Sequence, residues 1–66
     1  MELRDIINAK KVIFYLQGGH VISGKITATS TIRFLEHYQK VFTVTTASGK
    51  ALVIVDEVVA YEIIGD

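Results

Sequence analysis

The stretch that decides the fold is LQGGHVISGKI, residues 16–26 of a chain of 66. Gly18 and Gly19 stand together where a tight turn would reverse the chain. Gly24 falls inside the run that follows, at a position that alternates with polar residues and so belongs to the inner face of a strand. A glycine there removes a side chain where a sheet must bend sharply, as small barrels require. We therefore expect a hairpin that leads into a strongly bent strand.

The flanking sequence continues the two-residue period of β-structure. Before the turn, Val12, Phe14 and Leu16 alternate with Ile13 and Tyr15, which predicts a strand with Tyr15 on its outer face. After it, we expect a strand from Val21 to Ala28, a hairpin of Val41–Thr46 and Ala51–Val55 joined by Ala47–Lys50, a break at Asp56–Val59, and a last strand at Ala60–Ile64.

Two segments differ from this pattern. In Glu2–Lys10, Leu3, Ile6 and Ile7 have helical spacing, which predicts a short amphipathic helix that is marginal alone and must dock on something. Thr29–Lys40 is compatible with a long loop or with a strand at Ile32–His37 that has its own turn. The sequence predicts a single all-β domain over 1–66, with the N-terminal helix in 1–10 and a five-stranded barrel in 11–66.

Composition narrows the range of functions. The chain has no Cys, and its two histidines, His20 and His37, have no ligand spacing, so we expect neither a disulfide nor a metal site. Half of the residues are hydrophobic, which is a large share for so small a domain and favours self-association. No apolar run is long enough to span a membrane and no signal peptide is evident, so a cytoplasmic location is expected.

The net charge is zero but unevenly distributed. Residues 1–40 carry six basic and three acidic side chains, whereas residues 41–66 carry one basic and four acidic ones. Nucleic-acid binding depends largely on neutralising phosphate, so the zero net charge counts against it, while a local basic face stays possible.

The order of a helix followed by five bent strands, with a brief turn before the last, resembles the Sm/LSm fold, a small SH3-like barrel. Within that family the chain is most similar to Hfq, the bacterial RNA chaperone. The similarity is carried by Tyr15–Ile26, which match the pattern of an aromatic residue, Leu, a glycine turn and an inner Gly, and by Leu52–Ile64, which match the final strand–turn–strand.

The resemblance implies a homo-oligomeric ring of six or seven subunits, in which the fourth strand of one subunit pairs with the fifth strand of the next. The interface residues would be Val53, Val55, Tyr61 and Ile63. It would also explain why Ala51–Val55 is apolar on both faces, although a cap formed by the N-terminal helix is the alternative.

The resemblance further implies single-stranded RNA binding on a ring face. Residues that match or flank the RNA-binding positions, or that supply positive charge, are Tyr15, Gly19, His20, Lys25, Lys11 and Arg33. Their alternatives are ordinary: Tyr15 could pack at an interface, and the histidine and the basic residues could simply be solvated. Arg33–Lys40 interleaves basic and aromatic residues, which suits RNA but equally suits an amphipathic hairpin.

One departure from the family favours a different function. At the turn that lines the pore, Hfq has a Lys-His pair, whereas this chain has Asp56 and Glu57. A ring of carboxylates would repel phosphate. The alternative function is therefore a ring-forming structural or protein-interaction module that binds no RNA. We expect no enzyme activity and no cofactor, because no convergent set of catalytic groups and no phosphate-binding loop is evident.

Overall fold

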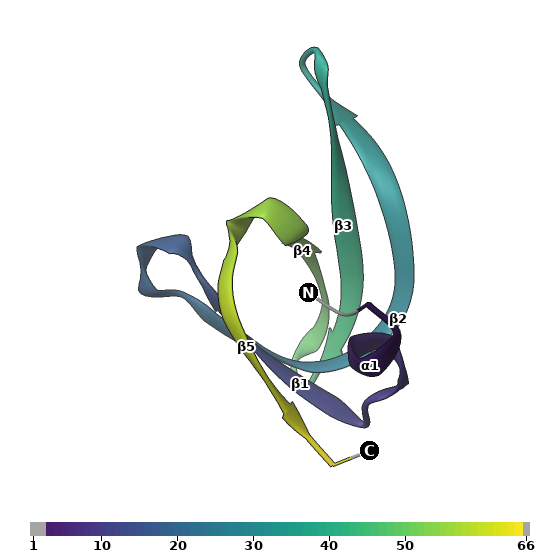
Figure 1. Cartoon of the computed structure of the whole chain (residues 1–66), viewed down its shortest axis with the longest axis vertical. Helices are drawn as coiled ribbons and strands as arrows, with labels where there is room; N and C mark the ends of the chain where they lie inside the picture. Colours follow the sequence, from purple (N-terminus) through teal and green to yellow (C-terminus); the bar gives the residue numbers. More distant parts are fainter. Residues whose placement is uncertain (1–2, 66) are drawn as a thin grey trace.

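The computed structural model describes residues 3–65, with the side chains of Leu3 and Phe34 left aside. A short helix is followed by five strands, and a 3-10 turn stands before β2 and another before β5 (Figure 1). The elements are α1 (Leu3–Asn8), β1 (Lys11–Leu16), η1 (Gln17–Gly19), β2 (Val21–Phe34), β3 (His37–Thr46), β4 (Gly49–Ile54), η2 (Val55–Glu57) and β5 (Val58–Ile64). The prediction of a mostly β chain with an N-terminal helix is confirmed.

The strands form one antiparallel sheet in the order β4-β3-β2-β1-β5, so β4 and β5 are its two edges. Four successive antiparallel pairings leave the two edge strands pointing the same way along the sheet. Closing the sheet within one chain would thus make β4 and β5 a parallel pair. Parallel neighbours need a crossover of a dozen or more residues, and only the three residues of η2 connect these strands. The sheet is accordingly open, and the described residues do not form a closed barrel.

The bend in β2 lies at Gly24, as expected. β2 pairs with β1 up to Gly24, opposite Val12, and pairs with β3 from Lys25 onward, opposite Thr45. β3 crosses so close to this point that a Cβ on Gly24 would lie 2.1 Å from the carbonyl oxygen of Thr45. The missing side chain therefore allows one strand to serve both halves of the sheet (Figure 1).

The core lies in the concave side of this bent sheet. Phe14 of β1 and Phe42 of β3 belong to strands that are not neighbours, and their rings stack across the core with centroids 5.8 Å apart. The helix contributes Ile6, and Ala9 beyond its end is also buried, so α1 docks on the sheet as predicted. The buried core residues are Ile6, Ala9, Val12, Phe14, Ile26, Phe42, Val44 and Val53.

Two details of β2 differ from the sequence-based prediction. The ladder between β2 and β3 shifts register between Ile26 and Ala28, which is a β-bulge at Thr27. A bulge moves the residues after it to the other face. Ala28 is consequently exposed, so the simple alternation that a strand from Val21 to Ala28 implies, with Ala28 on the inner face of Ile26, is wrong.

The ambiguous segment Thr29–Lys40 is neither a loop nor a separate strand. It is the outer part of a long hairpin, because β2 continues to Phe34 and β3 begins at His37. The two-residue turn Leu35-Glu36 connects them, with Leu35 at a φ of 58°. Figure 1 shows this hairpin projecting well beyond the rest of the molecule.

Candidate nucleic-acid interface

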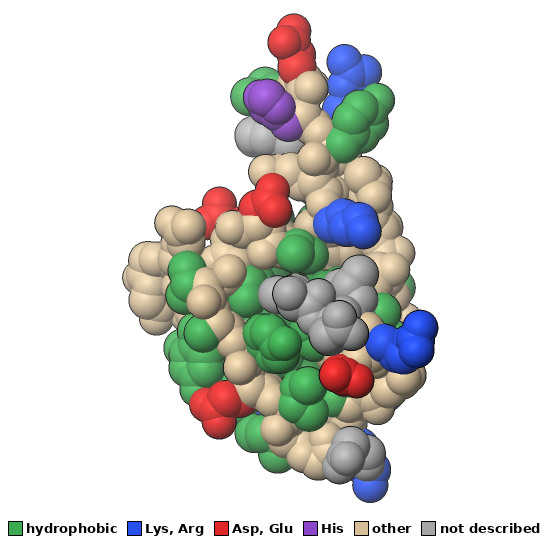
Figure 2. Space-filling model, in the orientation of Figure 1, with side chains coloured by type: hydrophobic (Ala, Val, Ile, Leu, Met, Phe, Trp, Pro, Cys, Tyr) green, Lys and Arg blue, Asp and Glu red, His purple; other side chains and the backbone are tan. Residues whose placement is uncertain are grey.

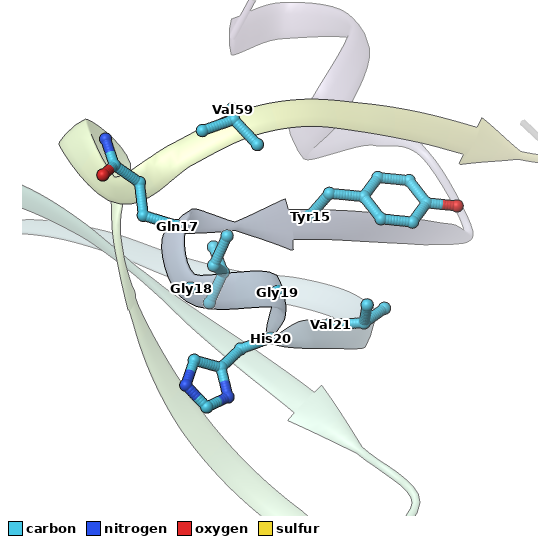
Figure 3. Close-up of a pocket in the computed structure, with 8 residues that line it drawn as sticks. Tyr15, Gln17, Gly18, Gly19, His20, Val21 and Val59 are labelled. Carbon is cyan, nitrogen blue, oxygen red and sulfur yellow. The ribbon is translucent and has the colours of Figure 1, made fainter.

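The main candidate site is a shallow depression around the turn between β1 and β2 (Figure 3). Its volume is about 410 Å³, and it lies between this turn and the edge strand β5. The lining residues are Tyr15, Leu16, Gln17, Gly18, Gly19, His20, Val21 and Val59. Three of the predicted RNA-binding residues, namely Tyr15, Gly19 and His20, are thus brought together.

The turn is held by its glycines and by one main-chain hydrogen bond. Gly18 and Gly19 both have a φ of 84°, a left-handed conformation that costs other residues about 1–2 kcal/mol. The Leu16 N–H donates to the His20 carbonyl oxygen over 2.8 Å and closes the turn. The turn is flanked by β1 and β2, so it does not present the helix N-terminus that a phosphate-binding loop uses.

Tyr15 points outward from β1 and is anchored to β5. Its hydroxyl donates to Oε1 of Glu62 over 2.5 Å, although the two residues are 47 positions apart in sequence. This hydrogen bond, together with desolvation and the negative charge of Glu62, raises the pKa of Tyr15 above its usual value of 10.0. The phenol is held in one orientation, with its hydroxyl directed away from Gly18 and Gly19 (Figure 3).

Both predicted lysines, Lys11 and Lys25, share the outer face with Tyr15. Lys11 lies four residues before Tyr15 on β1, so the two side chains point to the same face. Lys25 likewise lies four residues after Val21, which is the partner of Tyr15 on β2. The ammonium of Lys25 donates to the Ala9 carbonyl oxygen over 3.2 Å, so it also joins β2 to the end of the helix. Lys11 is exposed. Positive charge therefore lies on the same sheet surface as the aromatic ring.

The other two predicted residues are placed differently. The ring of His20 extends away from Tyr15, so the two aromatic groups do not form one stacking surface (Figure 3). Arg33 lies in the outer hairpin, near the tip, where its Nε donates to the Leu35 carbonyl oxygen over 3.2 Å. Arg33 is thus not part of the depression around Tyr15.

The acidic turn is exposed. Asp56 and Glu57 both belong to η2, which packs beside β3 between the two edge strands. Figure 2 shows acidic side chains near the foot of the projecting hairpin. The negative charge is therefore available to whatever approaches this end of the sheet.

The four residues expected at a subunit interface are divided between the core and the surface. Val53 is buried in the core, so its side chain is not available to another subunit and only its main chain is at the edge. Val55 and Tyr61 pack partly against the core, whereas Ile63 is 40% exposed.

The sequence-based prediction missed the most exposed apolar side chains of the two edges. Leu52 of β4 and Val59 of β5 are each 63% exposed, and Ile64 is also exposed. Leu52 neighbours the buried Val53, so strand alternation would have predicted its exposure. The exposure of Val59 could not be predicted in this way, because the pairing of β5 with β1 shifts register between Tyr15 and Leu16.

Comparisons with known proteins do not add to this description. No family model, curated protein or solved structure matches the chain. In the part of the chain that the structure describes, no helix has the length and hydropathy needed to cross a bilayer. Function must therefore be argued from the residues and their geometry.

Proposed function

We propose that the chain assembles into a homo-oligomeric ring of Sm-like small barrels and binds single-stranded RNA on a face of the ring. The observation that carries this proposal is the pair of free edge strands, β4 and β5, that one chain cannot pair with each other. The resemblance of Tyr15–Ile26 and Leu52–Ile64 to the Hfq branch points to the same assembly.

The edges have the properties of surfaces that meet a partner. β4 has six residues and β5 has seven, so they are matched in length, and neither contains a proline. Leu52 on one edge, and Val59 and Ile63 on the other, expose apolar side chains. Unprotected edges of this kind otherwise pair without control. Pairing of β4 with β5 of the next copy uses two different surfaces, and such an arrangement gives a closed ring when the rotation allows it.

Tyr15 supplies the stacking element on the ring face. Its hydroxyl is anchored by Glu62, so the ring does not need to be ordered when a base binds. Stacking of a base on an aromatic ring contributes about 1–3 kcal/mol, and a ring assembly repeats this interaction in every subunit. Lys11 and Lys25 on the same face supply charge for phosphate, whereas Arg33 lies in the hairpin and is not needed at this face.

The acidic turn favours the second candidate function. Asp56 and Glu57 are exposed, and in a ring their carboxylates would gather around the pore and repel phosphate. We accordingly place RNA on the face of Tyr15 rather than in the pore. If repulsion of phosphate by these carboxylates outweighs the attraction by Lys11 and Lys25, the ring is instead a structural or protein-interaction module that binds no RNA.

The experiment has two stages. Light scattering gives the mass in solution, and a monomer at micromolar concentration would exclude the ring. Labelled A-rich and U-rich single-stranded oligonucleotides are then titrated at two salt concentrations, and absence of binding at low salt leaves only the protein-interaction module.

A matched pair of variants tests the proposed face. Tyr15→Phe keeps the ring and removes the hydrogen bond to Glu62, whereas Tyr15→Ala removes both. We expect Tyr15→Ala to weaken binding and Tyr15→Phe to retain most of it. Unchanged binding by Tyr15→Ala would show that RNA does not use this face.

A further inference from the structure

The outer part of the β2–β3 hairpin is a second surface that the depression around Tyr15 does not include. Val41 and Phe42 are the last buried residues of β3 toward the tip. Beyond them, every described side chain from Thr29 to Lys40 is exposed or half-exposed. The described side chains of this part of the hairpin thus meet solvent on both faces, and the hairpin projects from the body of the molecule (Figure 1).

The register sorts its side chains onto two faces. Arg33 is opposite Tyr38, and Thr31 is opposite Lys40, and paired residues share a face. The intervening positions belong to the other face. They include the pair of Ile32 and Gln39, and His37 beside the turn. We call the first set, Thr31, Arg33, Tyr38 and Lys40, the hairpin face. It holds an aromatic ring that is 72% exposed and two cations, and it has no carboxylate.

The hairpin face continues into a small depression at the foot of the hairpin. This depression has a volume of about 210 Å³ and is lined by Ile7 of the helix and by Thr29, Ser30, Thr31 and Lys40. The lining combines hydroxyl groups, one ammonium group and an apolar side chain. Hydroxyl and ammonium groups donate hydrogen bonds, and phosphate oxygens accept them.

Stability does not account for this extension. A two-stranded hairpin without a hydrophobic face to bury is marginal in water. Its turn places Leu35 at a φ of 58° and leaves it 77% exposed, where glycine or asparagine would be less strained. Among the described side chains of the extension, Leu35 and Tyr38 are 77% and 72% exposed, and exposed apolar and aromatic groups of this size are a property of a binding surface.

We propose that the hairpin face is a separate binding surface for single-stranded RNA. Tyr38 stacks on a base, and Arg33 and Lys40 contact neighbouring phosphates. The choice of RNA as the partner rests on the proposed function. It is supported by an exposed aromatic ring that has one cation directly opposite it on β2 and a second cation two residues along β3, all on one face.

A lipid surface fits the hairpin less well. Leu35 at the tip would enter the bilayer first, but Glu36 follows it directly and would be buried with it. Burying an unpaired carboxylate is unfavourable.

The test compares the two faces of the hairpin. Fluorescence anisotropy with a labelled single-stranded oligonucleotide is measured for the full chain and for Tyr38→Ala, Arg33→Ala with Lys40→Ala, and His37→Ala. All four side chains are exposed, so the variants should fold, which circular dichroism checks. His37→Ala is the control, because it removes a basic aromatic residue from the opposite face.

We expect Tyr38→Ala to weaken binding at least about five-fold. The double variant should lower the salt slope by about 0.7 for each phosphate that it no longer neutralises. His37→Ala should bind like the wild type.

The failures are distinguishable. If the wild type binds RNA and both hairpin-face variants bind equally well, the hairpin inference is wrong and the proposed function stands. If the wild type binds no RNA at low salt, both are wrong. An equal loss of affinity in His37→Ala and Tyr38→Ala would refute the assignment to one face. Retention of the chain by phosphatidylserine vesicles, abolished in the double variant and without RNA binding, would show a lipid partner instead.

Discussion

Gly24→Ala is the substitution that tests the fold most sharply. Gly24 is the point at which β2 exchanges β1 for β3 as its partner. The added methyl group would lie 2.1 Å from the Thr45 carbonyl oxygen and 2.9 Å from both the Thr45 carbonyl carbon and Cγ1 of Val44. The Val44 side chain can rotate, but the carbonyl group is part of the β3 main chain.

The magnitude follows from what must move. Relief of the clash requires β3 to shift by at least about 1.4 Å, the difference between the 2.1 Å contact and the lower end of ordinary van der Waals separations of about 3.5–4.0 Å. Overpacking a well-packed core typically costs about 1–3 kcal/mol. The shift also disturbs ladder pairs next to Thr45, and each broken hydrogen bond costs about 1 kcal/mol. We expect a total of at least about 2 kcal/mol, against a stability of roughly 3–10 kcal/mol for a domain of this size.

Urea denaturation followed by circular dichroism measures the destabilisation, at one protein concentration because self-association would raise apparent stability. Gly19→Ala is the matched control. Gly19 has a φ of 84° and no heavy atom within 4 Å of the added methyl group, so only the backbone cost of about 1–2 kcal/mol applies. If Gly24→Ala destabilises the chain no more than Gly19→Ala does, the close crossing of β2 and β3 is wrong.

Three further predictions concern the outer surface. Glu62→Gln should lower the pKa of Tyr15 toward 10.0 in an NMR titration of its ring, and an unchanged pKa would exclude the hydrogen bond. Because the folded-state pKa is raised, the contribution of this bond to stability is present below about pH 10 and is lost as the pH rises through the folded-state value. Asp56→Asn with Glu57→Gln should strengthen RNA binding at low salt, and an unchanged affinity would show that the acidic turn does not oppose phosphate. Leu52→Lys should lower the mass found by light scattering with little effect on the fold, since Leu52 is 63% exposed; an unchanged mass would exclude β4 from the interface.

The parts of the fold that followed from the sequence depend on local alternation. Val12 and Phe14 are buried as their spacing predicts, Tyr15 points outward, and Gly24 lies on the inner face at the bend. Each of these follows from the two-residue period and from the absence of a side chain at one position. Local patterns of this kind are visible in a single sequence.

The parts that did not follow depend on longer-range structure. The bulge at Thr27 reverses the alternation without any unusual residue to mark it. The turn Leu35-Glu36 contains no glycine, asparagine or proline, so the sequence offered a hairpin in this segment only as one alternative and did not mark the position of its turn. The pairing of Tyr15 with Glu62 depends on β5 lying beside β1, which residue spacing alone does not show.

The central claim is that copies of this chain join through their edge strands and hold RNA. Native mass spectrometry of the chain with a single-stranded oligonucleotide measures both in one spectrum. We predict one closed species, six or seven times the monomer mass of 7.3 kDa, with RNA bound. A monomer, or an open series of increasing masses, would contradict the ring, and a closed ring that takes up no oligonucleotide would contradict its role in RNA binding.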